Sequence, residues 1–188
     1  MESPKNFLYR KPIKKEAQRL TTGEIHKILQ YVAKNRKNQA MILLLLTTGL
    51  RLSELCSLQK QQFKKAILIG NVYQINVLGK GKKLRSIFLP ITTRNCCTSL
   101  KSKGSSVLGM KKATVQYRIS RIRNATHIKF SAHTLRHTYL SYLASQGADV
   151  YKIQKIAGHA SLTTTSLYLH CSNKELADTA GLVCNLME

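Results

Sequence analysis

Six side chains along the 188-residue sequence carry groups that could together transfer a phosphoryl group without a metal ion. Two arginines can hold the non-bridging oxygens of a phosphate with their forked N–H donors. A lysine and two histidines can supply further donors and exchange protons, while a tyrosine hydroxyl attacks the phosphorus in line. The residues with this chemistry are Arg51, Lys80, His133, Arg136, His159 and Tyr168.

Tyr168 lies in the stretch "AGHASLTTTSLYLH", residues 157–170, where its spacing alone would suit a packing aromatic. A phenol has a pKa of about 10 and needs nearby cations before it attacks at neutral pH. The two arginines, the lysine and the histidines would supply that charge, so the combination favours Tyr168 as a nucleophile. Tyr139, Tyr142 and Tyr151 are spaced like ordinary core or surface aromatics.

The local settings of the charged candidates differ. Arg51 follows a helix-ending glycine in "TTGLRLSEL" and could simply pair with Glu54, although we favour Glu54 as the residue that orients it. Lys80 lies between two glycines in "GKGKK", with Lys82 and Lys83 as rivals in the same turn. His133 and Arg136 are three residues apart and would share one helix face.

Metal or cofactor chemistry is not expected. The pair His133 and His137 has the spacing of a metal-binding helix, but the glutamate that a zinc protease carries after the first histidine is missing. His137 is therefore interpreted as a structural histidine. The five cysteines are odd in number and contain no C-x-x-C pair, which favours reduced structural thiols over disulfides or zinc ligands.

The charge balance indicates a polyanionic partner. The chain has 31 Lys and Arg against 8 Asp and Glu, a formal charge of +23, for which nucleic acid is the commonest partner. A ribosomal-type protein and a binder of anionic membranes are the alternatives. The longest apolar run, residues 40–46, is far shorter than the roughly 20 residues of a membrane span. The first 20 residues also lack the apolar core of a signal peptide, so we expect a cytoplasmic protein with no membrane association.

The elements that must position these side chains are mainly helical. Thr21 and Glu24 have capping-box spacing at the start of a first helix, and Gly49 is placed to end a second one over residues 38–48. A short third helix opens with "RLSELCSL", and further helices are predicted at 92–101, 111–124, 132–146, 149–157, 161–169 and 173–181. Short β-rich segments separated by glycines predict a small antiparallel sheet inserted near residues 65–90. The expected fold class is α+β, mainly α.

The sequence resembles the tyrosine recombinases, or phage integrases, including the Xer-type recombinases. The resemblance runs from about Leu20 to about Leu182 and rests on three motifs in order: "TTGLRLSEL", "LGKGKKLRSIFLP" and "HTLRHTYLSYLASQGADVYKIQKIAGHASLTTTSLYLH". It implies a catalytic domain over residues 21–188, preceded by a basic arm or linker at 1–20. The helical core-binding domain that family members carry ahead of the catalytic domain is not expected in this chain.

The resemblance also implies a role for each candidate. Arg51 and Arg136 would hold the scissile phosphate, and Lys80 would protonate the leaving 5′ hydroxyl. The two histidines would act next to them, His133 in acid–base chemistry and His159 as a donor to the phosphate. Tyr168 would form a 3′-phosphotyrosyl link that conserves bond energy, so that neither metal nor ATP is needed.

The resemblance leaves the partners and the activity open to several hypotheses. Double-stranded DNA is the expected partner, and assembly on it as a homo-oligomer, with a tetramer as the candidate form, is the expected state. The C-terminal stretch "NKELADTAGLVCNLME" would be exchanged between protomers or would pack on its own domain. A DNA recombinase of a plasmid, phage or other mobile element is the favoured hypothesis; a truncated DNA-binding remnant without strand exchange and a topoisomerase-like enzyme are the alternatives.

Overall fold

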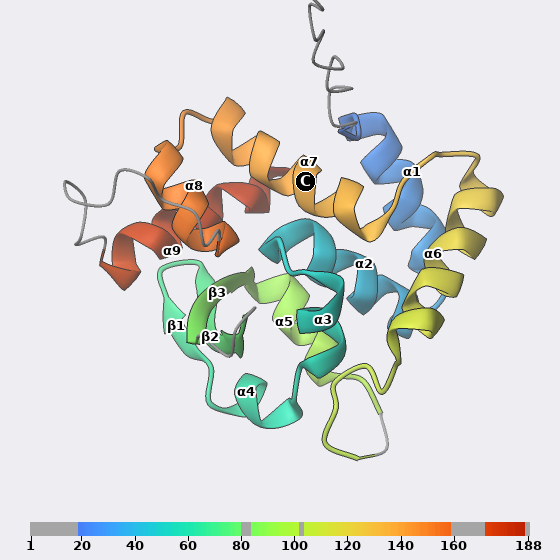
Figure 1. Ribbon diagram of the computed structural model, residues 1–188, viewed down its shortest axis with the longest axis horizontal. Helices are drawn as coiled ribbons and strands as arrows, with labels where there is room; N and C mark the ends of the chain where they lie inside the picture. The colour runs from blue at the N-terminus through green and yellow to red at the C-terminus, as the bar shows by residue number, and fades with distance from the viewer. Residues whose placement is uncertain (1–18, 80–83, 102–103, 159–171, 187–188) are drawn as a thin grey trace, which may run out of the picture.

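The structure is a computed structural model that describes residues 19–79, 84–101, 104–158 and 172–186 (Figure 1). Its described part is mainly helical with one small sheet, which confirms the predicted α+β class. The helices are α1 (Thr22–Val32), α2 (Arg36–Thr48), α3 (Leu52–Ser57), α4 (Lys60–Lys64), α5 (Ile91–Thr98), α6 (Lys112–Thr126), α7 (Ala132–Ser145), α8 (Val150–Ala157) and α9 (Asn173–Gly181). A 3₁₀ turn, Leu182–Leu186, follows α9.

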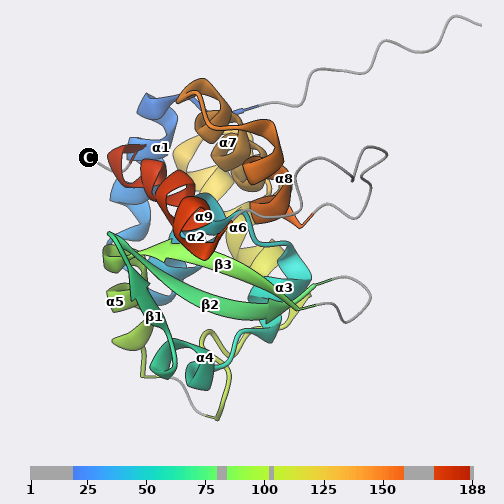
Figure 2. The ribbon, with the colours of Figure 1, turned by 90° about the vertical axis from the view of Figure 1, so that its left-hand side faces the viewer.

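The sheet lies where the sequence predicts it. Strands β1 (Ile67–Ile69), β2 (Val72–Leu78) and β3 (Leu84–Pro90) are antiparallel in the order β1-β2-β3, and the register pairs Val77 with Arg85. Figure 2 shows α9 over one side of the sheet and α5 on the other, and both helices contact β2 and β3. The sheet is therefore held between α5, from the middle of the chain, and α9, from near its C-terminal end.

The core is centred on α2, which contacts α1, α3, α5, α7 and β3. Every residue from Ala40 to Thr48 is buried, as expected of a helix whose apolar side chains extend round its whole circumference. Helical spacing predicts a buried stripe of Leu135, Tyr139, Leu140 and Leu143 on α7; three of these side chains are buried and Leu140 is half-buried. The packing of α7 on α2 fixes the two helices from which the site is built.

The helix ends follow the local signals of the sequence. Thr21 and Glu24 form the predicted capping box at the start of α1, and the Asp149 carboxylate caps α8 by accepting from the backbone of Tyr151 and Lys152. Gly49 ends α2 and Gly158 ends α8, both in the left-handed conformation with φ of 61° and 63°. These two glycines turn the chain beside the candidate site.

Some elements differ from the prediction. The short helix α4 was not expected from the sequence, and α5 ends at Thr98 rather than near residue 101. The helix predicted over residues 161–169 lies outside the described residues. In α9 and the turn after it, Ala177, Ala180, Val183 and Leu186 are buried against the same chain, which is one of the two arrangements expected for this tail.

The described helices include none that could cross a lipid bilayer, because each is too short or too polar.

Candidate active site

The structure brings together three of the six predicted site residues. Arg51 directly precedes α3, and His133 and Arg136 lie in the first turns of α7. All three line one cavity of about 650 Å³, whose remaining wall comes mainly from α6 and from the segment before α7. Lys80, His159 and Tyr168 lie outside the described residues.

Arg51 is positioned by the turn that Gly49 makes at the end of α2. Glu54, one helical turn further on, accepts from the Arg51 backbone N–H with Oε2 at 2.8 Å and from the Arg51 guanidinium with Oε1 at 3.1 Å. The second guanidinium nitrogen donates to the Gly158 carbonyl at 2.8 Å. The side chain remains 31% exposed, so part of its fork is accessible from solvent. The sequence left open whether Glu54 simply pairs with Arg51 or orients it. In the structure the same ion pair does both, because it fixes the direction of the Arg51 side chain.

Arg136 joins the ends of two helices. One guanidinium nitrogen donates to the Gly49 carbonyl at the end of α2, and the other donates to the Ala157 carbonyl of α8 at 2.7 Å. The last carbonyls of a helix have no partner within the helix and carry its partial negative charge, so a guanidinium is a favourable partner for them. Arg136 is buried, with 7% of its surface exposed, yet it still lines the cavity.

A third arginine, Arg85 of β3, joins the same cluster, and the sequence motifs did not identify it. Its Nε and Nη2 donate to the two carboxylate oxygens of Glu54 at 3.4 and 2.8 Å, and its Nη1 donates to the Ile156 carbonyl at 2.5 Å. A signal was present in the strand, because alternation puts Arg85 on the same face as the fully buried Ile87 and Leu89. A charged residue in such a position must have partners.

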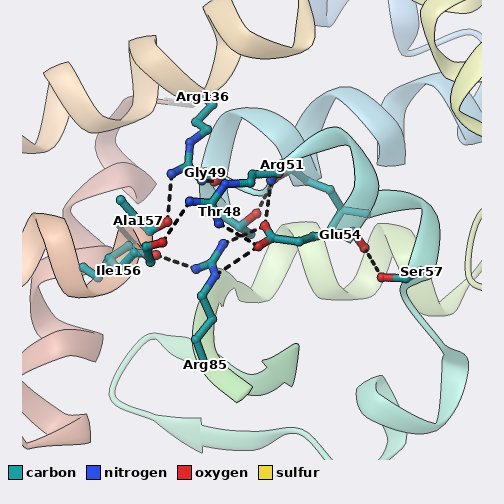
Figure 3. A network of polar contacts seen from close by, with 11 residues as sticks. Thr48, Gly49, Arg51, Glu54, Ser57, Arg85, Arg136, Ile156 and Ala157 are labelled. Carbon is teal, nitrogen blue, oxygen red and sulfur yellow. Dashed lines mark hydrogen bonds and ion pairs between the residues drawn. The ribbon is translucent and has the colours of Figure 1, made fainter. Parts of the chain in front are cut away.

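The three arginines hold three successive carbonyls at the end of α8. The guanidinium of Arg85 donates to the Ile156 carbonyl, that of Arg136 to the Ala157 carbonyl, and that of Arg51 to the Gly158 carbonyl. Figure 3 shows Arg85 and Arg136 pointing toward Ile156 and Ala157. These residues immediately precede His159 in the sequence. The contacts attach the end of α8 to the segments that carry Arg51 and Arg136.

The cluster carries an excess of positive charge. Among the described residues, its ionised members are three guanidinium groups and one carboxylate, that of Glu54. Burial, followed by the charges of Arg51 and Arg85, lowers the pKa of Arg136 to about 10, although the charge of Glu54 acts in the opposite direction. Arg136 is still protonated at neutral pH, so the cavity is lined by cations that lack a full complement of anions. An anion bound there would relieve this repulsion.

Glu54 is held as a carboxylate. Burial by itself would raise its pKa, but the hydrogen bonds from Arg85 and Arg51 and the charges of both arginines outweigh burial and lower it. Glu54 is 3% exposed, and its two oxygens accept from both arginines. It therefore remains ionised well below neutral pH and keeps the arginines oriented.

The two histidines of α7 lie in different surroundings. His133 is exposed and lines the cavity, whereas the ring of His137 lies 6.5 Å from that of His133 and its Nδ1 is 3.2 Å from the Ser141 hydroxyl. Ser131 caps α7 and lines the cavity, so the positive end of the helix dipole borders it. In the described part of the chain, no three His, Cys, Asp or Glu side chains are gathered as a metal site would require.

The comparison with protein families matches residues 18–175 to the phage integrase family. The chain belongs to the phage integrase family. Among curated proteins it is 33% identical over 172 residues to a tyrosine recombinase of Pseudothermotoga lettingae, a match that covers 85% of this chain and 58% of that protein. The chain spans between about half and two thirds of the length of the curated relatives that it matches.

Solved structures of integrases share the fold. The integrase of mycobacterium phage Brujita superposes with a TM-score of 0.73 at 22% identity, over 92% of this chain and 60% of that one. The XerH site-specific recombinase bound to its difH substrate gives a TM-score of 0.66 at 24% identity, over 93% of this chain and 56% of that one. The integrase fold predicted from the sequence motifs is therefore confirmed.

Proposed function

We propose that this chain is the catalytic part of a site-specific DNA recombinase that cuts and rejoins strands through a 3′-phosphotyrosyl intermediate. The single observation that carries the proposal is the cavity lined by Arg51, Arg136 and His133, where guanidinium groups exceed carboxylates. Such a site has the donors and the charge to bind one phosphodiester and to stabilise the negative charge that develops on it. The membership of the phage integrase family supports DNA as the source of that phosphate.

The proposed step balances without a cofactor. The Tyr168 Oη attacks the phosphorus and passes its proton to His133, the bond from phosphorus to O5′ breaks, and O5′ takes a proton from Lys80 and leaves as the 5′ hydroxyl. The phosphodiester is replaced by a phosphotyrosyl ester of the same bond type, so a 5′ hydroxyl can reverse the reaction and rejoin a strand. Arg51 and Arg136 hold the non-bridging oxygens throughout, His133 assists proton transfer, and His159 donates to the phosphate.

We further propose that the chain acts on double-stranded DNA as a homo-oligomer, with a tetramer as the candidate form. Two strand exchanges need several nucleophiles, and each protomer of this chain would supply one Tyr168. Among the fold relatives, XerH is described in complex with its difH substrate and a lambda integrase as a dimer on a core site, which supports the same kind of partner here.

The experiment that tests this function is covalent trapping. The protein is incubated with DNA of its own replicon, the reaction is stopped with detergent, and the wild type is compared with Tyr168→Phe. We expect an adduct on a 3′ phosphate that is absent in Tyr168→Phe and retained in the matched control Tyr117→Phe, which changes an exposed tyrosine of α6. Mapping the adducts would locate the target site.

The other outcomes identify the alternatives. Salt-sensitive DNA binding without any adduct would reject the enzyme and identify a DNA-binding remnant. An adduct accompanied by relaxation of supercoiled DNA at many sequences, by a protein that remains monomeric on DNA, would identify a topoisomerase-like enzyme instead.

A further inference from the structure

Arg85 connects three parts of the chain that carry proposed catalytic residues. It lies on β3, five residues after Lys80, and its guanidinium binds Glu54, the partner of Arg51. The same guanidinium binds the Ile156 carbonyl, three residues before His159. The side chain thus links the strand that follows the hairpin, the start of α3 and the end of α8.

The contacts of Arg85 leave it little freedom to bind DNA. Each of its three guanidinium nitrogens already donates to an acceptor within the protein, and only 11% of the side chain is exposed. Unlike Arg51 and Arg136, it does not line the cavity. Arg85 therefore binds groups of the protein itself rather than a phosphate.

Gly158 shows how closely Arg85 is fitted to the end of α8. A Cβ atom on Gly158 would lie 2.5 Å from Cδ and 2.8 Å from Nε of Arg85, so the arginine stem crosses directly over this glycine. The carbonyl of the same glycine accepts from Arg51. A closed ring of contacts results, which runs from Arg51 through Glu54 and Arg85 to the end of α8 and back to Arg51.

We propose that Arg85 is a positioning residue that fixes the end of α8 and the carboxylate of Glu54 together, and through them orients Arg51, without contacting DNA. The inference rests on the proposed function, because it concerns residues placed for strand cleavage. Without Arg85, the Ile156 carbonyl loses its donor and Glu54 keeps Arg51 as its cationic partner. Arg51 and the segment that follows α8 then lose a fixed relative position.

The test compares Arg85→Gln, Arg85→Lys, Gly158→Ala and the double variant Arg85→Gln/Gly158→Ala in the full chain. The first-order rate of adduct formation is measured at saturating DNA, together with DNA affinity at several salt concentrations and the thermal midpoint. We expect Arg85→Gln to lower the rate by about 10- to 100-fold, since misplacing a catalytic group by about 1 Å has an effect of that order. DNA affinity and its salt dependence remain unchanged, and Arg85→Lys retains more of the rate than Arg85→Gln.

Gly158→Ala displaces the Arg85 stem, so its effect and that of Arg85→Gln share one cause. The double variant is therefore expected to be no slower than the slower single variant.

Two matched controls test whether backbone strain alone, or the loss of any guanidinium, would slow cleavage. Gly147→Ala introduces the same left-handed strain, with φ of 76° but no atom within 4 Å of the new Cβ, and Arg94→Gln removes a guanidinium that packs 4.3 Å from the centroid of the Tyr73 ring. Both controls keep the wild-type cleavage rate.

Three results would overturn the proposal: an unchanged rate in Arg85→Gln, rate losses that multiply in the double variant, or a salt slope reduced by about one phosphate contact, which would make Arg85 a DNA ligand. Hydrogen exchange at the last amides of α8 provides a readout that needs no activity. We expect faster exchange there in Arg85→Gln and no change in Arg94→Gln. If the wild type forms no adduct, the proposed function has failed, while the exchange result still decides whether Arg85 holds α8.

Discussion

The ring of Tyr139 lies directly against the backbone of Gly49, and a Cβ atom on this glycine would lie 2.8 Å from Cδ1 of the tyrosine. The carbonyl of the same glycine accepts from Arg136. The contact between Tyr139 of α7 and the end of α2 therefore leaves room for no side chain at position 49. This position lies in the turn that leads from α2 to Arg51.

Gly49→Ala is expected to destabilise the fold. The residue has φ of 61°, where a side chain costs about 1–2 kcal/mol, and crowding against Tyr139 adds about 1–3 kcal/mol. Urea unfolding followed by circular dichroism measures the change. Gly23→Ala is the matched control, because Gly23 lies in α1 with no atom within 4 Å of the new Cβ, and alanine favours a helix. Equal stability of the two variants would contradict the expected crowding.

Arg136→Lys is expected to lower the rate of adduct formation by about 10²- to 10³-fold, by analogy with the loss of one donor from an oxyanion hole. A lysine has one nitrogen and cannot donate to the Gly49 and Ala157 carbonyls in the same planar fork. Single-turnover trapping measures the rate, and a filter-binding assay shows that DNA is still bound. Arg94→Lys, in α5, is the control. Retained cleavage in Arg136→Lys would mean that point charge, rather than the fork, is sufficient.

Glu54→Gln is expected to lose stability in a pH-dependent manner. The pKa of Glu54 is lowered in the folded protein below its ordinary value of 4.5, so the folded state binds its proton more weakly than the unfolded chain does. The stabilisation by the carboxylate is complete above the ordinary value and is lost as the pH falls through the folded value. The difference in unfolding free energy between wild type and Glu54→Gln should therefore be largest at neutral pH and shrink in acid. A difference independent of pH would show that the carboxylate charge has no role.

Arg123→Gln is expected to lower the affinity for DNA and to make that affinity less dependent on salt concentration. Arg123 is exposed on α6 and lines the cavity, so it is placed to contact a phosphate near the site. Losing one phosphate contact lowers the slope of log affinity against log salt by about 0.9. A salt titration of DNA affinity measures this slope. Lys174→Gln is the matched control, because α9 lies on the side of the molecule away from α6 (Figure 1), and its slope should equal that of the wild type.

The sequence allowed the elements and part of the site to be predicted because those signals are local. Gly49 and Gly158 predict helix ends, the β-rich segments of "AILIGNVYQINV" on either side of a glycine predict strands, and the three-residue spacing of His133 and Arg136 predicts a shared face. The contacts of Arg85 could not be predicted in the same way, because its partners are a carboxylate 31 residues away and a backbone carbonyl 71 residues away. Every residue has a backbone carbonyl, so the residue type gives no indication of which carbonyl accepts a hydrogen bond from a side chain.

That property of the carbonyls bears on how the protein can change over generations. The three acceptors at the end of α8 belong to the main chain, so no point mutation at Ile156 or Ala157 can delete them, whatever side chain replaces the present one. Tolerance to mutation is therefore distributed unevenly: Ile156 and Ala157 can change to side chains that fit the packing, whereas the three arginines supply the donors and Gly158 leaves no room for a side chain. A mutational scan of this helix end would show that apolar residues of similar size are tolerated at Ile156 and Ala157 and that no side chain is tolerated at Gly158.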